Sequence, residues 1–206
     1  MKMKTLSRRH FVAGSTAAGV LAAAGPALAH NNAAYVMPED FLPVEVALKT
    51  ELAPGELHVD PATYRLYWTL PENRAMRYTV GVGRAGLYHD GEFMMKVKKE
   101  WPSWTPTPAM IARNTGYARW RDGMPGGINN PLGARALYLF DATGQDTFLR
   151  IHGTNAPQTI GTSVSNGCAR LTNEHIVDLY NRVPVETRVV LHPKGLAPVI
   201  LDETMV

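Results

Sequence analysis

Residues 56–98 read ELHVDPATYRLYWTLPENRAMRYTVGVGRAGLYHDGEFMMKVK and carry the clearest signal for the fold class. Runs rich in Val, Tyr, Leu, Met and Thr are typical of β-strands, and turn residues such as Asp60-Pro61 and His89-Asp90-Gly91 separate them. We expect strands at Glu56–Asp60, Thr63–Thr69, Met76–Val82 and Glu92–Lys98. Their close spacing predicts an antiparallel meander.

Further along the chain, strand signals return at Arg135–Phe140, Thr147–Ile151 and Thr187–Leu191. A helix is expected through about Asn181, because Thr172 or Asn173 can cap its start and Pro184 follows its end. A shorter helix is expected at Thr107–Arg113. The chain is therefore predicted to be mainly β, with one or two short helices.

Between Trp101 and Pro131 the regular periodicity disappears, and prolines alternate with tryptophans and a tyrosine. Loops of this length in compact domains are often lids or binding walls. Packing of the aromatic side chains on the loop's own domain is the alternative. The sequence does not choose between these two interpretations.

A histidine, a cysteine and an arginine lie close together in the sequence. They occur in two motifs, Ile151-His152-Gly153-Thr154 and Ser165-Asn166-Gly167-Cys168-Ala169-Arg170-Leu171. A thiol is nucleophilic as its thiolate, and a neighbouring imidazole or guanidinium favours that form. Gly167 lets a reacting carbonyl approach, and the Cys168 amide can donate to an oxyanion. This arrangement predicts a covalent acyl-enzyme, whereas a buried structural thiol is the alternative for a single cysteine.

These two motifs resemble the signature of the YkuD-type L,D-transpeptidase catalytic domain. The resemblance covers about residues 54–192 and includes Gram-negative members. It is carried also by Gly55–Asp60, Tyr78–Arg84, Trp104–Thr107 and Met124–Arg135. The resemblance implies a β-sandwich or barrel with one or two short helices, and no cofactor.

The activity that the resemblance implies is acyl transfer on peptidoglycan stem peptides. Cys168 would attack the bond between a third-position diamino acid and a fourth-position D-Ala, so that D-Ala leaves and a thioester remains. An amine from a second stem peptide, an envelope lipoprotein or a free D-amino acid would resolve the thioester, whereas water would give a carboxypeptidase product. Carbapenems are the implied inhibitors.

The same resemblance implies roles for individual residues. Cys168 is the nucleophile and His152 the base. Arg170 would organise the site or hold a substrate carboxylate, for which its guanidinium is well suited. The remaining motif residues are expected to line the substrate or oxyanion site or to shape the loop: Gly153, Thr154, Ser165, Asn166 and Gly167.

Asn166 departs from the family pattern, because many relatives have a histidine just before the Gly-Cys pair. Asparagine cannot take up a proton, so the assignment of the base depends on His152 alone. A non-catalytic peptidoglycan-binding module that keeps the fold is the rival interpretation.

A zinc site is a second rival, with His152, Cys168 and His175 as its ligands. The spacing matches no common structural zinc pattern, and a second cysteine is absent from the chain. The three histidines His58, His89 and His192 are expected to be ordinary surface or turn residues.

The first 29 residues are predicted to be a twin-arginine signal peptide. Ser7-Arg8-Arg9-His10-Phe11 precedes an Ala/Gly-rich apolar run that closes on Ala27-Leu28-Ala29. We expect cleavage after Ala29 and a periplasmic or cell-envelope location. A membrane anchor is the alternative, which the Gly25-Pro26 interruption and the scarcity of large apolar side chains disfavour.

The remaining segments are assigned from composition. Residues 30–53 are expected to form an N-terminal arm, 54–192 the catalytic domain and 193–206 a C-terminal tail. The signal segment holds four of the 21 Lys and Arg residues, so the mature chain keeps 17 against 18 Asp and Glu. No basic stripe is left for a nucleic-acid partner.

Overall fold

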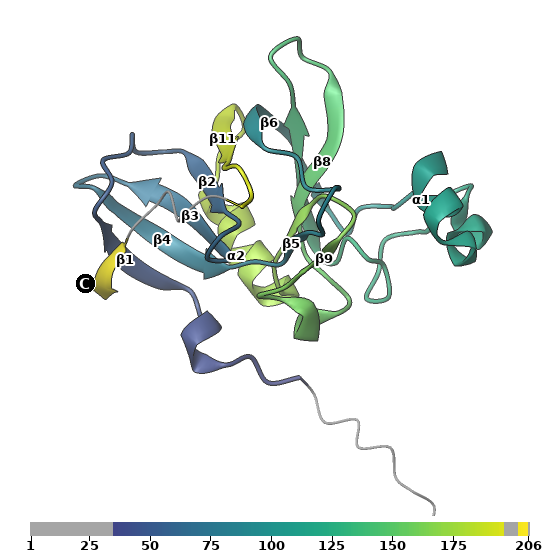
Figure 1. The fold of residues 1–206 in the computed structure, drawn as a ribbon, viewed down its shortest axis with the longest axis horizontal. Coiled ribbons are helices and arrows are strands. Elements are labelled where there is room, and N and C mark those ends of the chain that lie inside the picture. Colours follow the sequence, from purple (N-terminus) through teal and green to yellow (C-terminus); the bar gives the residue numbers. More distant parts are fainter. Residues whose placement is uncertain (1–34, 196–201, 206) are drawn as a thin grey trace, which may run out of the picture. The chain divides into compact units, whose positions relative to one another are not determined.

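The computed structural model describes residues 35–195 and 202–205 (Figure 1). The signal peptide predicted at residues 1–29 lies outside the described residues. Among the described residues, no helix combines the length and the apolar character needed to cross a bilayer.

One mixed sheet of ten strands dominates the described chain, in the order β10-β8-β7-β6-β11-β2-β3-β4-β1-β12 (Figure 1). Its strands are β1 (Val44–Leu48), β2 (Leu57–Asp60), β3 (Arg65–Leu70), β4 (Arg74–Thr79), β6 (Gly91–Glu100), β7 (Arg135–Phe140), β8 (Asp146–His152), β10 (Ala169–Arg170), β11 (Thr187–Leu191) and β12 (Asp202–Met205). A separate parallel pair joins β5 (Val82–Gly83) to β9 (Ser163–Ser165).

The described helices are few and short. They are α1 (Pro108–Arg113), α2 (Asn173–Arg182) and three 3-10 turns, η1 (Glu39–Phe41), η2 (Thr115–Trp120) and η3 (Pro157–Thr159). The prediction of a mainly β fold with one or two short helices is therefore confirmed.

The predicted meander is correct for β2, β3 and β4, which pair antiparallel in sequence order. It is wrong beyond β4. Strand β6 pairs with β7 and with β11, and β11 runs parallel to β2, with Val189 opposite Leu57. Between β4 and β6 the chain leaves the large sheet to form β5, which pairs with β9. Local composition identifies strands but not which distant strand will lie between two of them.

The segment expected to be an N-terminal arm contributes η1 and the strand β1. In β1, Val46 lies opposite Ala75 of β4, and both side chains are buried. The Asn73 amide donates to the Leu48 carbonyl at 2.7 Å and fixes the end of this strand. Residues 202–205 of the predicted tail form β12, which pairs with β1. The sheet thus extends beyond the segment that the motifs cover.

Helix α2 packs its apolar face into the main core. Ile176 and Leu179 are fully buried there together with strand residues such as Leu137 and Ile151. Burial of each such side chain contributes about 1.5–3 kcal/mol. The helix is closed at its start by the Thr172 hydroxyl, which accepts the His175 amide at 3.3 Å. A rigid helix therefore supports the strands that carry the motif residues.

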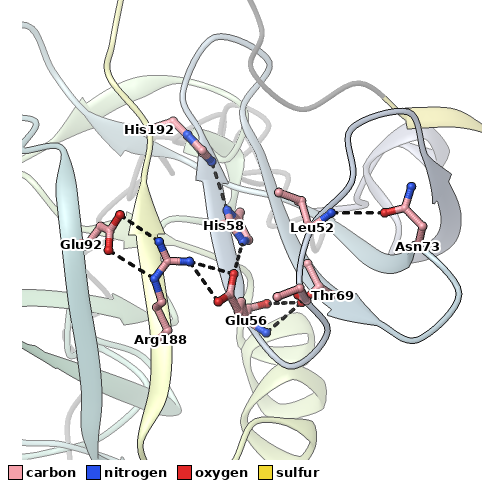
Figure 2. A network of polar contacts seen from close by, with 9 residues as sticks. Leu52, Glu56, His58, Thr69, Asn73, Glu92, Arg188 and His192 are labelled. Carbon is pink, nitrogen blue, oxygen red and sulfur yellow. Dashed lines mark hydrogen bonds and ion pairs between the residues drawn. The ribbon is translucent and has the colours of Figure 1, made fainter.

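A polar network that begins at buried His58 and ends at exposed Glu92 crosses β2, β6 and β11 (Figure 2). His58 is 3% exposed, with Nδ1 3.2 Å from His192 Nε2 and Nε2 3.0 Å from the Glu56 carboxylate. Arg188 joins Glu56 to Glu92. The prediction of a surface or turn residue is wrong for His58, because β2 is an inner strand with every residue buried. Burial lowers the pKa of His58, although Glu56 opposes the shift.

Candidate active site

The sheet register places the motif residues side by side. Strand β10 runs parallel to β8, with Ala169 opposite Ile151 and Arg170 opposite His152. Cys168 immediately precedes β10 and therefore lies beside the Arg150 end of this pairing. On its other side, β10 is held by Gly81, whose amide and carbonyl bond the Arg170 backbone at 2.9 and 2.8 Å. The histidine and the cysteine are thus brought together by one strand pair.

The loop that presents Cys168 is held by its own motif residues. The Ser165 hydroxyl donates to the Cys168 carbonyl at 2.7 Å and accepts the Gly167 amide at 3.2 Å. Gly167 has φ +131°, and a Cβ there would lie 2.9 Å from the Leu87 carbonyl oxygen. Glycine is required because a side chain would meet backbone that cannot give way.

Asn166 turns its side chain to Arg84. Its Oδ1 accepts from Arg84 Nη2 at 2.7 Å, while the Arg84 amide donates to the Ser165 carbonyl at 3.1 Å. Asn166 also lines the cavity at Cys168. The residue that departs from the family pattern is therefore tied to a guanidinium.

His152 is 5% exposed at the end of β8, and its Nδ1 lies 2.6 Å from the Gly153 carbonyl oxygen. An acceptor at this position requires Nδ1 to carry the hydrogen, which leaves the lone pair on Nε2. Burial lowers the pKa of His152 to about 4, and the charges of Arg170 and Arg150 act in the same direction. The imidazole is therefore neutral at neutral pH and able to accept a proton.

Asn173, the first residue of α2, fixes the loop that follows the histidine. Its Oδ1 accepts the Ala134 amide at 2.9 Å and the Thr154 amide at 3.3 Å. A Cβ on Gly153 would lie 2.4 Å from this oxygen. The sequence identified Asn173 as a helix-capping candidate only, since its contacts with the 133–134 and 153–154 backbone arise from tertiary structure.

Cys168 is partly exposed, and its Sγ lies 3.9 Å from the Phe148 carbonyl oxygen. Burial of the sulfur raises the pKa of the thiol. A hydrogen bond from the Arg150 amide and the charges of Arg150 and Arg170 oppose that rise. With His152 neutral, the resting pair is a neutral thiol beside a neutral imidazole.

Two cavities meet at Cys168. The first, of about 220 Å³, is lined also by His152 and Arg170, and the second, of about 230 Å³, by Phe148 and Arg150. Both cavities share three further residues: Trp104, Met110 and Leu132. The cysteine is therefore reachable from two sides.

The long loop supplies walls to both cavities and also packs on itself. Trp104 and Met110 belong to this loop, and Tyr117 lines the first cavity. The rings of Trp104 and Tyr117 meet edge to face with centroids 5.3 Å apart. The loop therefore both lines the cavities at Cys168 and packs on itself, so each of the two interpretations of its sequence holds in part.

The two arginines near the sulfur differ in their partners. The Arg170 guanidinium donates to Thr159, at 2.9 Å to Oγ1 and 3.4 Å to the carbonyl, and its buried Nε has no partner in the described chain. Arg150 forms a bidentate pair with Asp146 at 2.6 and 2.7 Å. Arg150 could not be identified from the sequence, because residues four apart in a regular strand do not meet and the bulge in β8 brings Arg150 to Asp146. Arg170 is the cation with capacity for a ligand carboxylate.

The third zinc candidate, His175, is buried in α2 and does not line either cavity at Cys168. Within residues 35–195 and 202–205, no three His, Cys, Asp or Glu side chains are grouped so that they could hold a metal ion. The structure does not bring His175 to the other two candidates.

Comparison with known proteins gives one consistent family. The model of the L,D-transpeptidase catalytic domain matches residues 54–191. The probable L,D-transpeptidase ErfK/SrfK of Escherichia coli is 36% identical over 155 residues, which are 72% of this chain and 47% of that protein. The probable L,D-transpeptidase YbiS of the same species is 38% identical over 136 residues, 64% of this chain and 42% of that protein. The chain spans about half the length of the curated relatives it matches.

Two solved structures share the fold. An L,D-transpeptidase variant of Enterococcus faecium has a TM-score of 0.51 and 15% identity, covering 68% of this chain and 50% of that one. A Brucella melitensis protein named as a probable carnitine operon oxidoreductase has a TM-score of 0.52 and 42% identity, covering 81% and 96%. The oxidoreductase name belongs to that protein, whereas the cavity in this chain is built around a cysteine and a histidine.

Proposed function

Because this chain belongs to the L,D-transpeptidase catalytic domain family, we propose that it is a peptidoglycan L,D-transpeptidase with Cys168 as nucleophile and His152 as base. One observation carries this proposal. Both residues line one cavity. The Gly153 carbonyl accepts a hydrogen bond from Nδ1 of the imidazole, so Nε2 has the free lone pair that can accept the thiol proton.

In the acylation step, Nε2 of His152 takes the proton from Cys168 Sγ. The sulfur attacks the carbonyl carbon that links the third-position diamino acid to D-Ala. The Cys168 amide stabilises the oxyanion, and Gly167 gives the carbonyl room. The C–N bond then breaks, and the leaving D-Ala nitrogen takes the proton from His152, so that a thioester and free D-Ala result.

In the second step, an amine attacks the thioester carbonyl and gives a proton to His152. The C–S bond breaks, and the sulfur takes this proton back. The two cavities that meet at Cys168 suit a reaction in which donor and acceptor reach the same sulfur. Water in place of the amine would give the carboxypeptidase product.

Arg170 is proposed to hold a carboxylate of the donor peptide. Its guanidinium makes no ion pair within the described residues, and burial lowers its pKa. A buried cation without a counter-ion is costly, so an anionic substrate group would relieve that cost. The roles of Ser165 and Asn166 are to shape the loop, through the Cys168 carbonyl and Arg84 respectively.

The place of action proposed for the enzyme is the periplasm or cell envelope, reached through the twin-arginine pathway, where stem peptides and lipoprotein amines are available. The paired Arg8 and Arg9 support this route. In cells, Arg8→Lys with Arg9→Lys should leave uncleaved precursor in the cytoplasm. Normal export of the double variant would assign the chain to the general secretory route.

The experiment that tests the function is mass spectrometry of products formed from tetrapeptide muropeptides, with and without added D-amino acid. Release of D-Ala with a new amide to the added amine is the expected result. Tripeptide alone in both samples would establish hydrolysis instead. Unchanged tetrapeptide in both samples would support the non-catalytic binding module.

A further inference from the structure

Phe148 in β8 has a backbone conformation that its own side chain does not explain. Its φ is +61°, in the left-handed region, and the residue is 71% exposed. For a non-glycine residue this conformation is less stable by about 1 kcal/mol or more. An exposed ring gains little burial in return, so the reason for the strain lies in the backbone.

The strain belongs to a bulge in the hairpin of β7 and β8. Tyr138 lies opposite Arg150 and Phe140 opposite Asp146, so one residue of β7 faces three residues of β8. Bulges of this kind redirect backbone groups and occur beside active sites. This one lies at the Cys168 end of β8, in the wall of the second cavity.

Asp146 holds the bulge in place. Its Oδ1 accepts the Phe148 amide at 2.8 Å, and its two oxygens accept from Arg150 Nη1 and Nη2 at 2.6 and 2.7 Å. The Arg150 guanidinium lies 3.9 Å from the centroid of the Tyr138 ring. The carboxylate therefore joins both ends of the segment 148–150 to the sheet.

Two backbone groups of this segment act on the cysteine sulfur. The Phe148 carbonyl accepts from the Sγ–H at 3.9 Å, and the Arg150 amide acts on the sulfur as a hydrogen-bond donor. An acceptor suits the protonated thiol, and a donor suits the thiolate. One short segment therefore supplies a hydrogen-bond acceptor for the thiol and a donor for the thiolate.

We propose that residues Asp146–Arg150 form a backbone cradle that positions Cys168, with Asp146 as the positioning residue that acts through the Phe148 and Arg150 peptide groups. The inference rests on the proposed nucleophilic role of Cys168. It assigns a role to an acidic residue and a strained aromatic residue that lie outside the sequence motifs.

A purely electrostatic role of Asp146 makes the opposite prediction. Removal of its negative charge would leave Arg150 unneutralised near the sulfur, which would lower the pKa of the thiol and speed its reactions. Loss of the cradle removes the carbonyl acceptor from the thiol and the amide donor from the thiolate. The bond to the charged form is the stronger of the two, so the net effect raises that pKa and slows the reactions. The sign of the change therefore separates the two roles.

The test is the rate at which iodoacetamide alkylates the full mature chain as a function of pH, followed by intact mass. Cys168 is the only cysteine, so every thiol adduct reports on it. Asp146→Ala is compared with Asp141→Ala, which removes the same charge from the same hairpin, where the Asp141 carboxylate accepts from Thr143 and Gln145. Thermal unfolding is recorded for each variant.

For Asp146→Ala we expect alkylation at pH 7.5 to slow by about tenfold and the thiol titration to move to higher pH, since the thiolate is the reacting form. Asp141→Ala should change the rate by less than about twofold, within the usual effect of a remote surface charge. An unchanged or faster rate in Asp146→Ala would overturn the cradle.

Phe148 provides a second test that is independent of charge. Phe148→Val disfavours the left-handed backbone and should slow alkylation by about tenfold, whereas Phe148→Gly accepts that backbone and should lose less than about threefold. Equal rates in the two variants would overturn the proposal. Neither test uses a peptide substrate, so a wild type that fails to turn over tetrapeptide would refute the proposed function and leave this result intact.

Discussion

The imidazole Nδ1 of His152 lies 2.6 Å from the carbonyl oxygen of Gly153, the next residue in the chain. The Asn173 side-chain oxygen fixes the following residue by accepting the Thr154 amide at 3.3 Å, and it requires glycine at 153, where a Cβ would lie 2.4 Å from it. Backbone and helix terminus together thus select the tautomer of the base. A carboxylate partner for the histidine is not required.

The lowered pKa of His152 predicts a pH dependence of stability. The unfolded chain binds a proton at the ordinary value of 6.5 and the folded chain only near 4, so stability should fall as the pH drops through this window. His152→Gln should lose less free energy of unfolding between pH 7 and pH 4, by up to about 3 kcal/mol. Urea unfolding at several pH values measures it. Equal losses in both proteins would contradict the neutral buried imidazole, because the other histidines are common to both.

Gly81 leaves space for the Arg170 guanidinium. A Cβ at residue 81 would lie 2.9 Å from Arg170 Nη2 and 2.9 Å from the Thr159 carbonyl oxygen, so Gly81→Ala should displace the guanidinium. We expect Gly81→Ala and Arg170→Ala to lower kcat/KM for tetrapeptide by a similar factor, about tenfold to a hundredfold, the usual cost of a charged contact to substrate. Steady-state D-Ala release measures it. Full activity in Arg170→Ala would remove the carboxylate-binding role.

Asn173 is predicted to stabilise the site through two backbone amides. Asn173→Ala leaves the Ala134 and Thr154 amides without their acceptor and should lower the free energy of unfolding by about 2 kcal/mol. Asn173→Asp keeps an oxygen acceptor and should lose less. Denaturant unfolding of the three proteins provides the comparison, and an equal loss in both variants would show that the oxygen does not matter.

Sequence reasoning was strongest where chemistry depends on local order. The strand Arg135–Phe140 was predicted with the bounds that the structure shows, and the helix at Asn173 was placed correctly at its start. Ser165, Gly167 and Cys168 lie in one short loop whose hydrogen bonds are local, so a motif could identify them together.

The rest of the site depends on contacts between distant strands. Phe148 and Arg150 reach the sulfur because a bulge in β8, held by Asp146, lies beside the start of β10. The burial of His58 follows from the insertion of β11 beside β2, which local alternation does not reveal. Register and strand order depend on tertiary packing, so they could not be predicted from local sequence.

Carbapenems should give one covalent adduct per mature chain, because Cys168 is the only thiol. Arg170→Ala should slow the adduct without preventing it, since the imidazole of His152 still activates the sulfur. Intact-protein mass spectrometry over time measures both. An adduct of the same mass on Cys168→Ser would refute the nucleophile assignment.

The most direct test of the account is the mass of the protein quenched during reaction with tetrapeptide. Wild type should gain the mass of the stem peptide without its D-Ala, and the mapped adduct should lie on Cys168. Cys168→Ser should show no such species and less than about a hundredth of wild-type D-Ala release, because serine lacks the acidity of a thiol. Turnover in the Cys168→Ser variant near the wild-type rate, or D-Ala release by wild type with no thioester on Cys168, would contradict the assignment of Cys168 as the nucleophile.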